Sequence, residues 1–87
     1  MSISDHLREM GTRVAGSGPR YVQLRARIEE AIETGLLPPG AALPPERDIA
    51  GLTGLSRVTV RKAIQALVDD GAVVQRQGSG SFVTDRS

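Results

Sequence analysis

The sequence predicts a mainly α-helical domain with a small β-hairpin, and three observations support this fold class. Apolar residues recur at helical spacing in successive segments. Glycine and proline residues separate those segments. After Gly71 the spacing becomes extended, with two short apolar runs around a glycine-rich turn. With 87 residues, the chain is long enough for one small domain.

The first 18 residues leave two alternatives open. They are largely polar and end in a Gly/Ser-rich stretch, which favours a flexible tail and joint with His6 exposed. The alternative is a short extra helix, because residues 2–5 fit a capping box. Four apolar residues also have helical spacing, namely Ile3, Leu7, Met10 and Val14. Gly11 interrupts this row, and we favour the tail.

The domain is expected over residues 19–84, and its first helix over residues 19 to about 34. Pro19 suits the first helical position, where no backbone N–H is needed. The apolar stripe of this helix comprises Leu24, Ile28, Ala31 and Ile32. Gly35 ends the helix, and the prolines that follow prevent it from resuming. Residues 41–43 are predicted to be a brief extended segment, because Pro44 disfavours helix before it.

A second, shorter helix is predicted to start at or near Pro45, with Glu46 at the favourable end of the helix dipole. Ile49 and Leu52 face inward at helical spacing. Residues 53–55 then form a tight turn into the next helix. Two helices joined by such a short, glycine-containing turn make a helix-turn-helix.

The third helix follows Ser56, a residue type that is favoured as an N-cap. Leu55 and Val60 have the spacing of a hydrophobic staple. Gly71 suits the left-handed position that follows the last turn of a helix. One apolar stripe runs along the helix, namely Val60, Ile64, Leu67 and Val68.

The charges on this third helix oppose its dipole. Cations occupy its first two turns and anions its C-terminal end, namely Arg57, Arg61 and Lys62 against Asp69 and Asp70. A helix dipole prefers the opposite order. The arrangement indicates that the start of the helix faces an external anion, which we take to be DNA phosphate. The hydroxyls of Ser56 and Thr59, together with the free N–H groups of the first turn, would form part of that anion site.

The extended runs 72–76 and 81–84 are predicted to form a β-hairpin around the glycine-rich turn. Val74, with either Phe82 or Val83, would point inward. A lone hairpin is marginal in water, so this one is expected to dock on the helices and pair with the extended segment before the second helix. The predicted fold is therefore a winged helix-turn-helix, a three-helix core plus a wing.

Composition excludes several classes of function. The chain has no cysteine and one histidine, so disulfides and thiolate metal sites are excluded and no metal site is expected. No nucleophile–base pair is visible, so neither an enzyme nor a bound cofactor is expected. No apolar run approaches the roughly 20 residues that span a bilayer, and the N-terminus lacks the order of a signal peptide. We therefore expect a cytoplasmic protein with no membrane partner.

Six motifs follow one another along the chain, namely PRYVQL at 19–24, GLLPPG at 35–40, LPPERDIA at 43–50, GLSRVTVR at 54–61, DG at 70–71 and QRQGSGSFV at 75–83. In sequence and in order they resemble the DNA-binding domain of the GntR family of bacterial transcription regulators. The first motif is most similar to the histidine-utilisation-repressor branch. Pro45 departs from the pattern, because the family commonly has Ser there. The departure removes a capping hydroxyl and one possible phosphate donor.

The resemblance implies sequence-specific binding of double-stranded DNA. Arg47 would reach the DNA backbone or a base from the second helix. From the third helix, the major groove would be entered or flanked by Arg57, Thr59 and Arg61. The wing tip would reach the minor groove through Gln77 and Gly78. General chemistry agrees, because a recognition helix contacts base edges with its N-terminal residues, and the planar fork of arginine matches the guanine acceptors.

Two further residues and one alternative complete the hypothesis. Ser56 joins the candidate DNA-binding set through its place in the anion site, and Lys62 is suited equally to phosphate or solvent. The alternative function is a winged-helix module that binds another protein, which would show an exposed apolar face and an uncharged recognition helix. The net charge of +1 supports nucleic-acid binding only weakly, and the single Tyr and single Phe argue against single-strand binding by base stacking.

The resemblance also implies a longer regulator that binds a palindromic operator as a homodimer. A separate C-terminal domain would bind a small-molecule effector. We expect this chain to be the N-terminal fragment of a metabolite-responsive repressor, with residues 85–87 as a stub that leads to the effector domain. The fragment itself is expected to be a monomer or weak dimer, because its apolar stripes are needed for the core. In the cell it would lie in the bacterial cytoplasm, on the nucleoid when bound to its operator.

Overall fold

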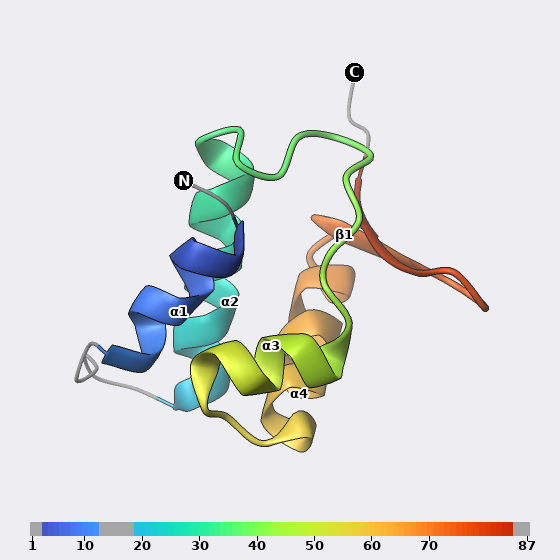
Figure 1. The fold of residues 1–87 in the computed structure, drawn as a ribbon. Coiled ribbons are helices and arrows are strands. Elements are labelled where there is room, and N and C mark those ends of the chain that lie inside the picture. The colour runs from blue at the N-terminus through green and yellow to red at the C-terminus, as the bar shows by residue number, and fades with distance from the viewer. Residues whose placement is uncertain (1–2, 13–18, 85–87) are drawn as a thin grey trace.

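The computed structural model of the chain describes residues 3–12 and 19–84 (Figure 1). Its elements in order are α1 (Ile3–Thr12), α2 (Arg20–Glu33), α3 (Glu46–Thr53), α4 (Arg57–Asp69), β1 (Val73–Arg76) and β2 (Gly80–Val83). The predicted class, a mainly α-helical domain with one hairpin, is confirmed. Within these residues no helix combines the length and the apolar character needed to cross a membrane.

One hydrophobic core joins the helices to the base of the hairpin. α4 lies at its centre, since α2, α3 and β1 all pack against it. The largest of the fully buried core side chains are Leu7, Leu24, Ile28, Ile49, Val60, Ile64, Leu67 and Val73. These residues come from all four helices and from β1, so removal of their apolar surface from water stabilises the whole arrangement at once.

Over residues 3–12 the structure has a helix, α1, in place of the tail that composition favours. α1 packs on α2 and α3, and Leu7 is completely buried there. The expectation that His6 is exposed is wrong. Only 5% of its surface is accessible. Its Nε2 lies 2.9 Å from the carbonyl oxygen of Arg27, and the Arg27 Nε donates to the carbonyl oxygen of His6 at 3.2 Å. Val14 and the expected joint lie outside the described residues.

Proline precedes α2 and α3 by one residue. Pro19 and Pro45 occupy the N-cap positions of these helices, one residue before the first-turn position that proline usually takes. Their carbonyl oxygens accept hydrogen bonds from the first turns, at 3.1 Å from the Val22 N–H and 3.0 Å from the Asp48 N–H. Neither helix has a side-chain cap, because proline carries no polar side-chain atom.

The hairpin buries a different valine of its first strand from the one predicted. β1 and β2 pair in antiparallel fashion, with Val73 opposite Val83 and Val74 opposite Phe82. Val73 and Val83 are buried, whereas Val74 is 37% exposed. The prediction that Val74 points inward is therefore wrong, and Val83 is the buried residue of the second strand. Because side chains alternate along a strand, a shift of one residue exchanges its two faces.

The hairpin is anchored on the segment that leads into α3. The Leu43 N–H donates to the carbonyl oxygen of Ser81 at 2.9 Å, and the Val83 N–H donates to that of Ala41 at 2.8 Å. These bonds make one isolated bridge, between Ala42 and Phe82, in place of a third strand. The predicted pairing of the hairpin with residues 41–43 is confirmed in this reduced form.

Candidate nucleic-acid interface

The start of α4 is fixed by its own side chains. The Ser56 Oγ accepts a hydrogen bond from the Thr59 backbone N–H at 3.1 Å, as predicted for an N-cap, and lies 2.8 Å from the Thr59 Oγ1. Leu55 and Val60, on either side of this cap, are both buried, as the spacing of the hydrophobic staple predicts. Both hydroxyls are thus held together at the first turn of α4.

Two of the predicted DNA-binding arginines have exposed, unengaged side chains. Arg57 is the first residue of α4, and Arg47 is the second residue of α3. Within the described residues, neither side chain forms a hydrogen bond or an ion pair. Each guanidinium group therefore keeps all five of its N–H donors for an external acceptor.

Arg61 is held by Glu46, the first residue of α3. The Arg61 Nε donates to one oxygen of the Glu46 carboxylate at 3.3 Å, and its Nη2 donates to the other at 3.2 Å. This hydrogen bonding, with the negative charge of Glu46, raises the pKa of Arg61 above its ordinary value. The Arg61 side chain stays 66% exposed, so the remaining donors of its guanidinium are accessible.

Sequence reasoning missed the pairing of Glu46 with Arg61. It placed Glu46 at the favourable end of the α3 dipole and went no further. The two residues are separated by 15 positions, and their side chains meet only because the turn between α3 and α4 folds the two helices onto each other. The short length of that turn was the feature of the sequence that could have indicated this pairing.

Lys62 contacts an aromatic ring on another helix. Its Nζ lies 4.6 Å from the centroid of the Tyr21 ring, the geometry of a cation–π contact. Tyr21 is in the first turn of α2, so the contact links the start of α2 to the second turn of α4. Lys62 remains exposed, which leaves its ammonium group able to reach a phosphate beside this face.

Both acidic residues at the end of α4 have partners inside the domain, a cation for Asp70 and a neutral amide for Asp69. The Arg25 Nη2 lies 2.7 Å from the Asp70 Oδ2, and the Gln65 Nε2 donates to the Asp69 Oδ1 at 3.1 Å. Near the start of α4, the cations of the helix have one carboxylate partner among the described residues, which is Glu46 of α3, paired with Arg61. The start of the helix therefore keeps a surplus of positive charge at the positive end of its dipole.

The wing tip is a tight, exposed turn. The Ser79 N–H donates to the carbonyl oxygen of Arg76 at 3.0 Å, which closes the turn around Gln77 and Gly78. Gly78 has a φ of +78°, in the left-handed region that glycine adopts without strain. Figure 1 shows the hairpin projecting away from the helices, so its tip is free to meet another molecule.

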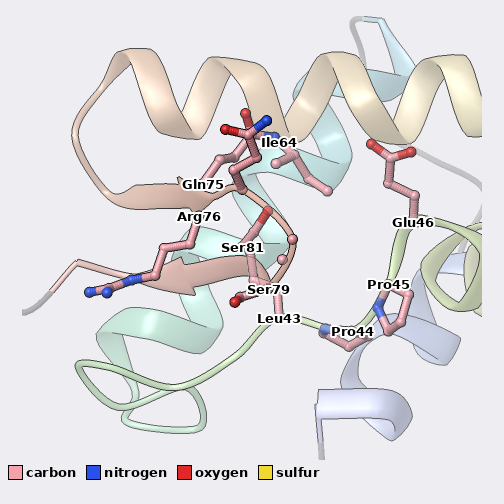
Figure 2. Close-up of a pocket in the computed structure, with 12 residues that line it drawn as sticks. Leu43, Pro44, Pro45, Glu46, Ile64, Gln75, Arg76, Ser79 and Ser81 are labelled. Atoms are coloured by element: carbon pink, nitrogen blue, oxygen red, sulfur yellow. The ribbon is translucent and has the colours of Figure 1, made fainter.

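A groove of about 640 Å³ lies between the hairpin and the segment that enters α3. Figure 2 shows Gln75 and Ser81 of the hairpin on one side, and Pro45 and Glu46 on the other. The groove brings together Gln77, Gly78 and the carboxylate that holds Arg61. The predicted site residues that do not line it are Arg47, Ser56, Arg57, Thr59, Arg61 and Lys62.

Comparison with protein families gives one match over most of the chain. The family model described as "Bacterial regulatory proteins, gntR family" matches residues 20–83. α1 lies outside the matched range.

Curated relatives match the same region. The HTH-type transcriptional regulator GgaR of Escherichia coli K12 is 41% identical over 71 residues, which cover 82% of this chain and 29% of the relative. The mannosyl-D-glycerate transport/metabolism system repressor MngR of the same strain is 44% identical over 70 residues, covering 80% of this chain and 29% of the relative. The chain thus spans less than a third of the length of these relatives.

Solved structures share the fold. The DNA-binding domain of AraR in complex with operator ORX1 superposes with a TM-score of 0.76 at 37% identity, covering 78% of this chain and 82% of that one. YtrA from Sulfolobus acidocaldarius, a GntR-family transcription factor, gives a TM-score of 0.73 at 34% identity, covering 85% and 62% of the two chains.

Proposed function

This chain belongs to the GntR family of bacterial regulatory proteins and forms the DNA-binding domain of a transcriptional regulator, and we propose that it binds a specific operator through the start of α4 and the wing tip. The family and the winged helix-turn-helix fold predicted from the sequence are confirmed. The assignment of individual residues to DNA is our proposal, argued from the surface described above.

The observation that carries the proposal is the uncompensated positive charge at the start of α4. Arg57 has no partner in the described part of the chain, and it lies where the exposed N–H groups of the first turn already favour an anion. The acidic residues at the other end have partners inside the domain. A DNA phosphate beside the first turn would supply the negative charge that this positive end of the helix lacks within the domain.

Each element of the site then has a distinct task. Arg57 and Arg61 read base edges in the major groove, since arginine matches the O6 and N7 acceptors of guanine. The hydroxyls of Ser56 and Thr59 and the cations of Arg47 and Lys62 position the domain on phosphates, because contacts to the backbone set register without reading sequence. Gln77 and Gly78 bring the wing backbone close to the minor groove.

A protein-interaction module remains the competing function, and the exposed apolar residues argue against it. Among the described residues, three large apolar side chains are exposed: Val22, Val58 and Val74. They belong to α2, α4 and β1, so no single element presents an apolar row of the kind that a protein partner would cover.

The properties of the whole regulator are also proposals. We propose that residues 19–84 are the DNA-binding unit of a longer cytoplasmic protein, without catalytic activity, that binds its operator as a homodimer and releases it in response to a small metabolite. One relative, MngR, is named as a repressor, which supports repression here. The inverted half-sites of such an operator would mirror the two-fold symmetry of the dimer.

A salt titration tests the proposed function. The chain is first used to select duplexes from a random library, and its affinity for the selected duplex is then measured between low and moderate salt. Four or five phosphate contacts, at about −0.9 each, predict a log–log slope of roughly −4. Failure to enrich any duplex, or affinity that does not change with salt, would overturn the proposal.

A further inference from the structure

Val58 is the most exposed large apolar side chain of the described residues. It is 73% exposed, against 37% for both Val22 and Val74. It is the second residue of α4 and lies between Arg57 and Thr59. The buried stripe of α4 is formed by Val60, Ala63, Ile64 and Leu67. With about 100° between successive residues, Val58 projects from the opposite side of the helix to this stripe.

Folding does not account for a valine at this place. Its side chain stays in water, so it contributes little apolar burial. Valine is also a weaker helix former than alanine, because its branched Cβ restricts the side chain against the helix backbone. The start of α4 is already fixed by Ser56 and by the buried pair Leu55 and Val60. On the proposed function this face of α4 meets the partner, so the exposed side chain of Val58 is available for an apolar contact with it.

The partner of this face is DNA, on the proposed function, and base edges offer few apolar groups. In the major groove each base pair presents hydrogen-bond donors and acceptors, and thymine alone adds a methyl group, at C5. The residues of a recognition helix that contact base edges are those of its N-terminal turns. Val58 is in that turn, and at about 100° per residue the exposed Arg61 and Lys62 lie within about 60° of it around the helix, where their cations can hold it in the groove.

We propose that Val58 contacts the C5 methyl group of one thymine in the operator and so helps to determine its sequence. The inference rests on the proposed function, because it needs α4 to lie in the major groove. A cytosine at that position carries a hydrogen atom at C5 in place of the methyl group, so the apolar contact would be lost. Val58 therefore discriminates in favour of thymine and against cytosine without making a hydrogen bond itself.

The test removes the apolar groups from each side of the contact in turn, namely the C5 methyl group of thymine and the two γ-methyl groups of Val58. The duplex selected from the random library is resynthesised with each thymine replaced singly by uracil, which lacks only the C5 methyl group. Wild-type protein should lose about three- to fourfold in affinity at one position, the change expected when about one methyl group is no longer buried. Val58→Ala, which removes two methyl groups, should bind the thymine duplex more weakly by at least this factor and should no longer distinguish thymine from uracil at that position.

A matched control separates this contact from a general effect of losing a valine. Val74 lies in β1 on the face opposite the buried Val73, away from α4, so Val74→Ala should keep the full thymine-to-uracil ratio. The thermal unfolding temperature of Val58→Ala should not fall below that of the wild type, since the side chain is exposed and alanine is the better helix former. Because the uracil scan also uses the wild-type protein, it is informative whatever the variant does.

Two results would overturn the inference alone. One is a uracil scan in which no thymine matters to the wild-type protein. The other is a Val58→Ala variant that retains the thymine-to-uracil ratio. In both cases selective, salt-dependent binding would leave the proposed function standing. Failure of the initial selection to enrich any duplex would instead overturn the proposed function, and the inference with it.

Discussion

Arg57 and Lys62 are both exposed cations near the start of α4, but their surroundings differ. Arg57 is unengaged within the described residues, whereas the Lys62 Nζ lies over the Tyr21 ring. We expect Arg57→Ala to cost about 1–3 kcal/mol of binding free energy and to relax selectivity at one or two base pairs. Lys62→Ala should weaken binding to all duplexes alike. Affinities for the selected duplex and its single-base variants distinguish these outcomes, and an Arg57→Ala protein with unchanged base preference would contradict the assignment.

Glu46 determines how much of the Arg61 charge is available to DNA. Its carboxylate raises the pKa of Arg61, so the stabilisation that this pairing gives is complete below the ordinary pKa of arginine and is lost only in strong alkali. We expect Glu46→Gln to bind unselected duplex more tightly, with a log–log salt slope up to about 0.9 steeper, because one more cation can then neutralise a phosphate. Selectivity should fall, since Arg61 loses the group that orients it.

Parallel salt titrations of wild type and Glu46→Gln, on selected and unselected duplexes, give the four slopes needed. Asp48→Asn is a suitable control, because it removes an exposed acidic charge from the same turn of α3, and Asp48 forms no hydrogen bond or ion pair with Arg61. Equal slopes for Glu46→Gln and wild type would show that Glu46 does not offset Arg61 on DNA.

Side-chain hydrogen bonds between near neighbours in the chain could be predicted from the sequence, and those between distant residues could not. The Ser56 cap on Thr59 follows from residue type and a spacing of three. The bonds between His6 and Arg27 span 21 positions and exist only once α1 lies on α2. A lone histidine in a polar segment carries no sign of such a partner. The roles of the eight predicted DNA-binding residues stay predictions.

At the scale of elements, periodicity located α2, α3 and α4 well, because each has a continuous apolar stripe bounded by glycine or proline. The N-terminal segment was harder. Its polar composition and Gly11 favoured a tail, whereas the spacing of Ile3 and Leu7 predicted the helix that the structure contains. The register of β1 was also not determined, since Val73 and Val74 are equally apolar and the strand alternates at every residue.

The burial of Leu7 predicts that α1 stabilises the domain. Leu7→Ala should lower the free energy of unfolding by about 2–5 kcal/mol, the range for removing a buried leucine side chain. Leu67→Ala, in α4, should cost a similar amount, and Val22→Ala, at an exposed position, should cost little. Urea unfolding followed by circular dichroism measures all three. A Leu7→Ala protein as stable as the wild type would mean that α1 does not pack on the domain in solution.

At the scale of the whole molecule, the apolar residues of α1 bear on assembly. Ile3 and Leu7 belong to the N-terminal row of apolar residues, which could otherwise supply a dimer face, but the structure packs both against the core. The stripes of α2 and α4 are used there as well. This distribution favours a fragment without a large apolar dimer face, so that pairing of half-sites would depend on the rest of the regulator.

We therefore expect the chain to sediment as a monomer in analytical ultracentrifugation and to occupy each half-site weakly. A tandem protein with two copies on a flexible linker should bind the full operator about 10²–10⁴ times more tightly, through effective concentration alone. The salt slope per half-site should not change. A stable free dimer that weakens on deletion of residues 1–18 would contradict this prediction and would make α1 a dimerisation helix.

The bonds that tie β2 to residues 41–43 also bear on how fast the domain associates with a duplex. Because the Leu43 N–H donates to Ser81 and the Val83 N–H to Ala41, the hairpin is fastened to the segment that opens into α3. The wing and α3 then arrive as one preformed body, with little conformational entropy left to lose on docking. The association rate constant should be governed by diffusion and electrostatic attraction, and differences in affinity between operators should appear mainly in how long each complex survives.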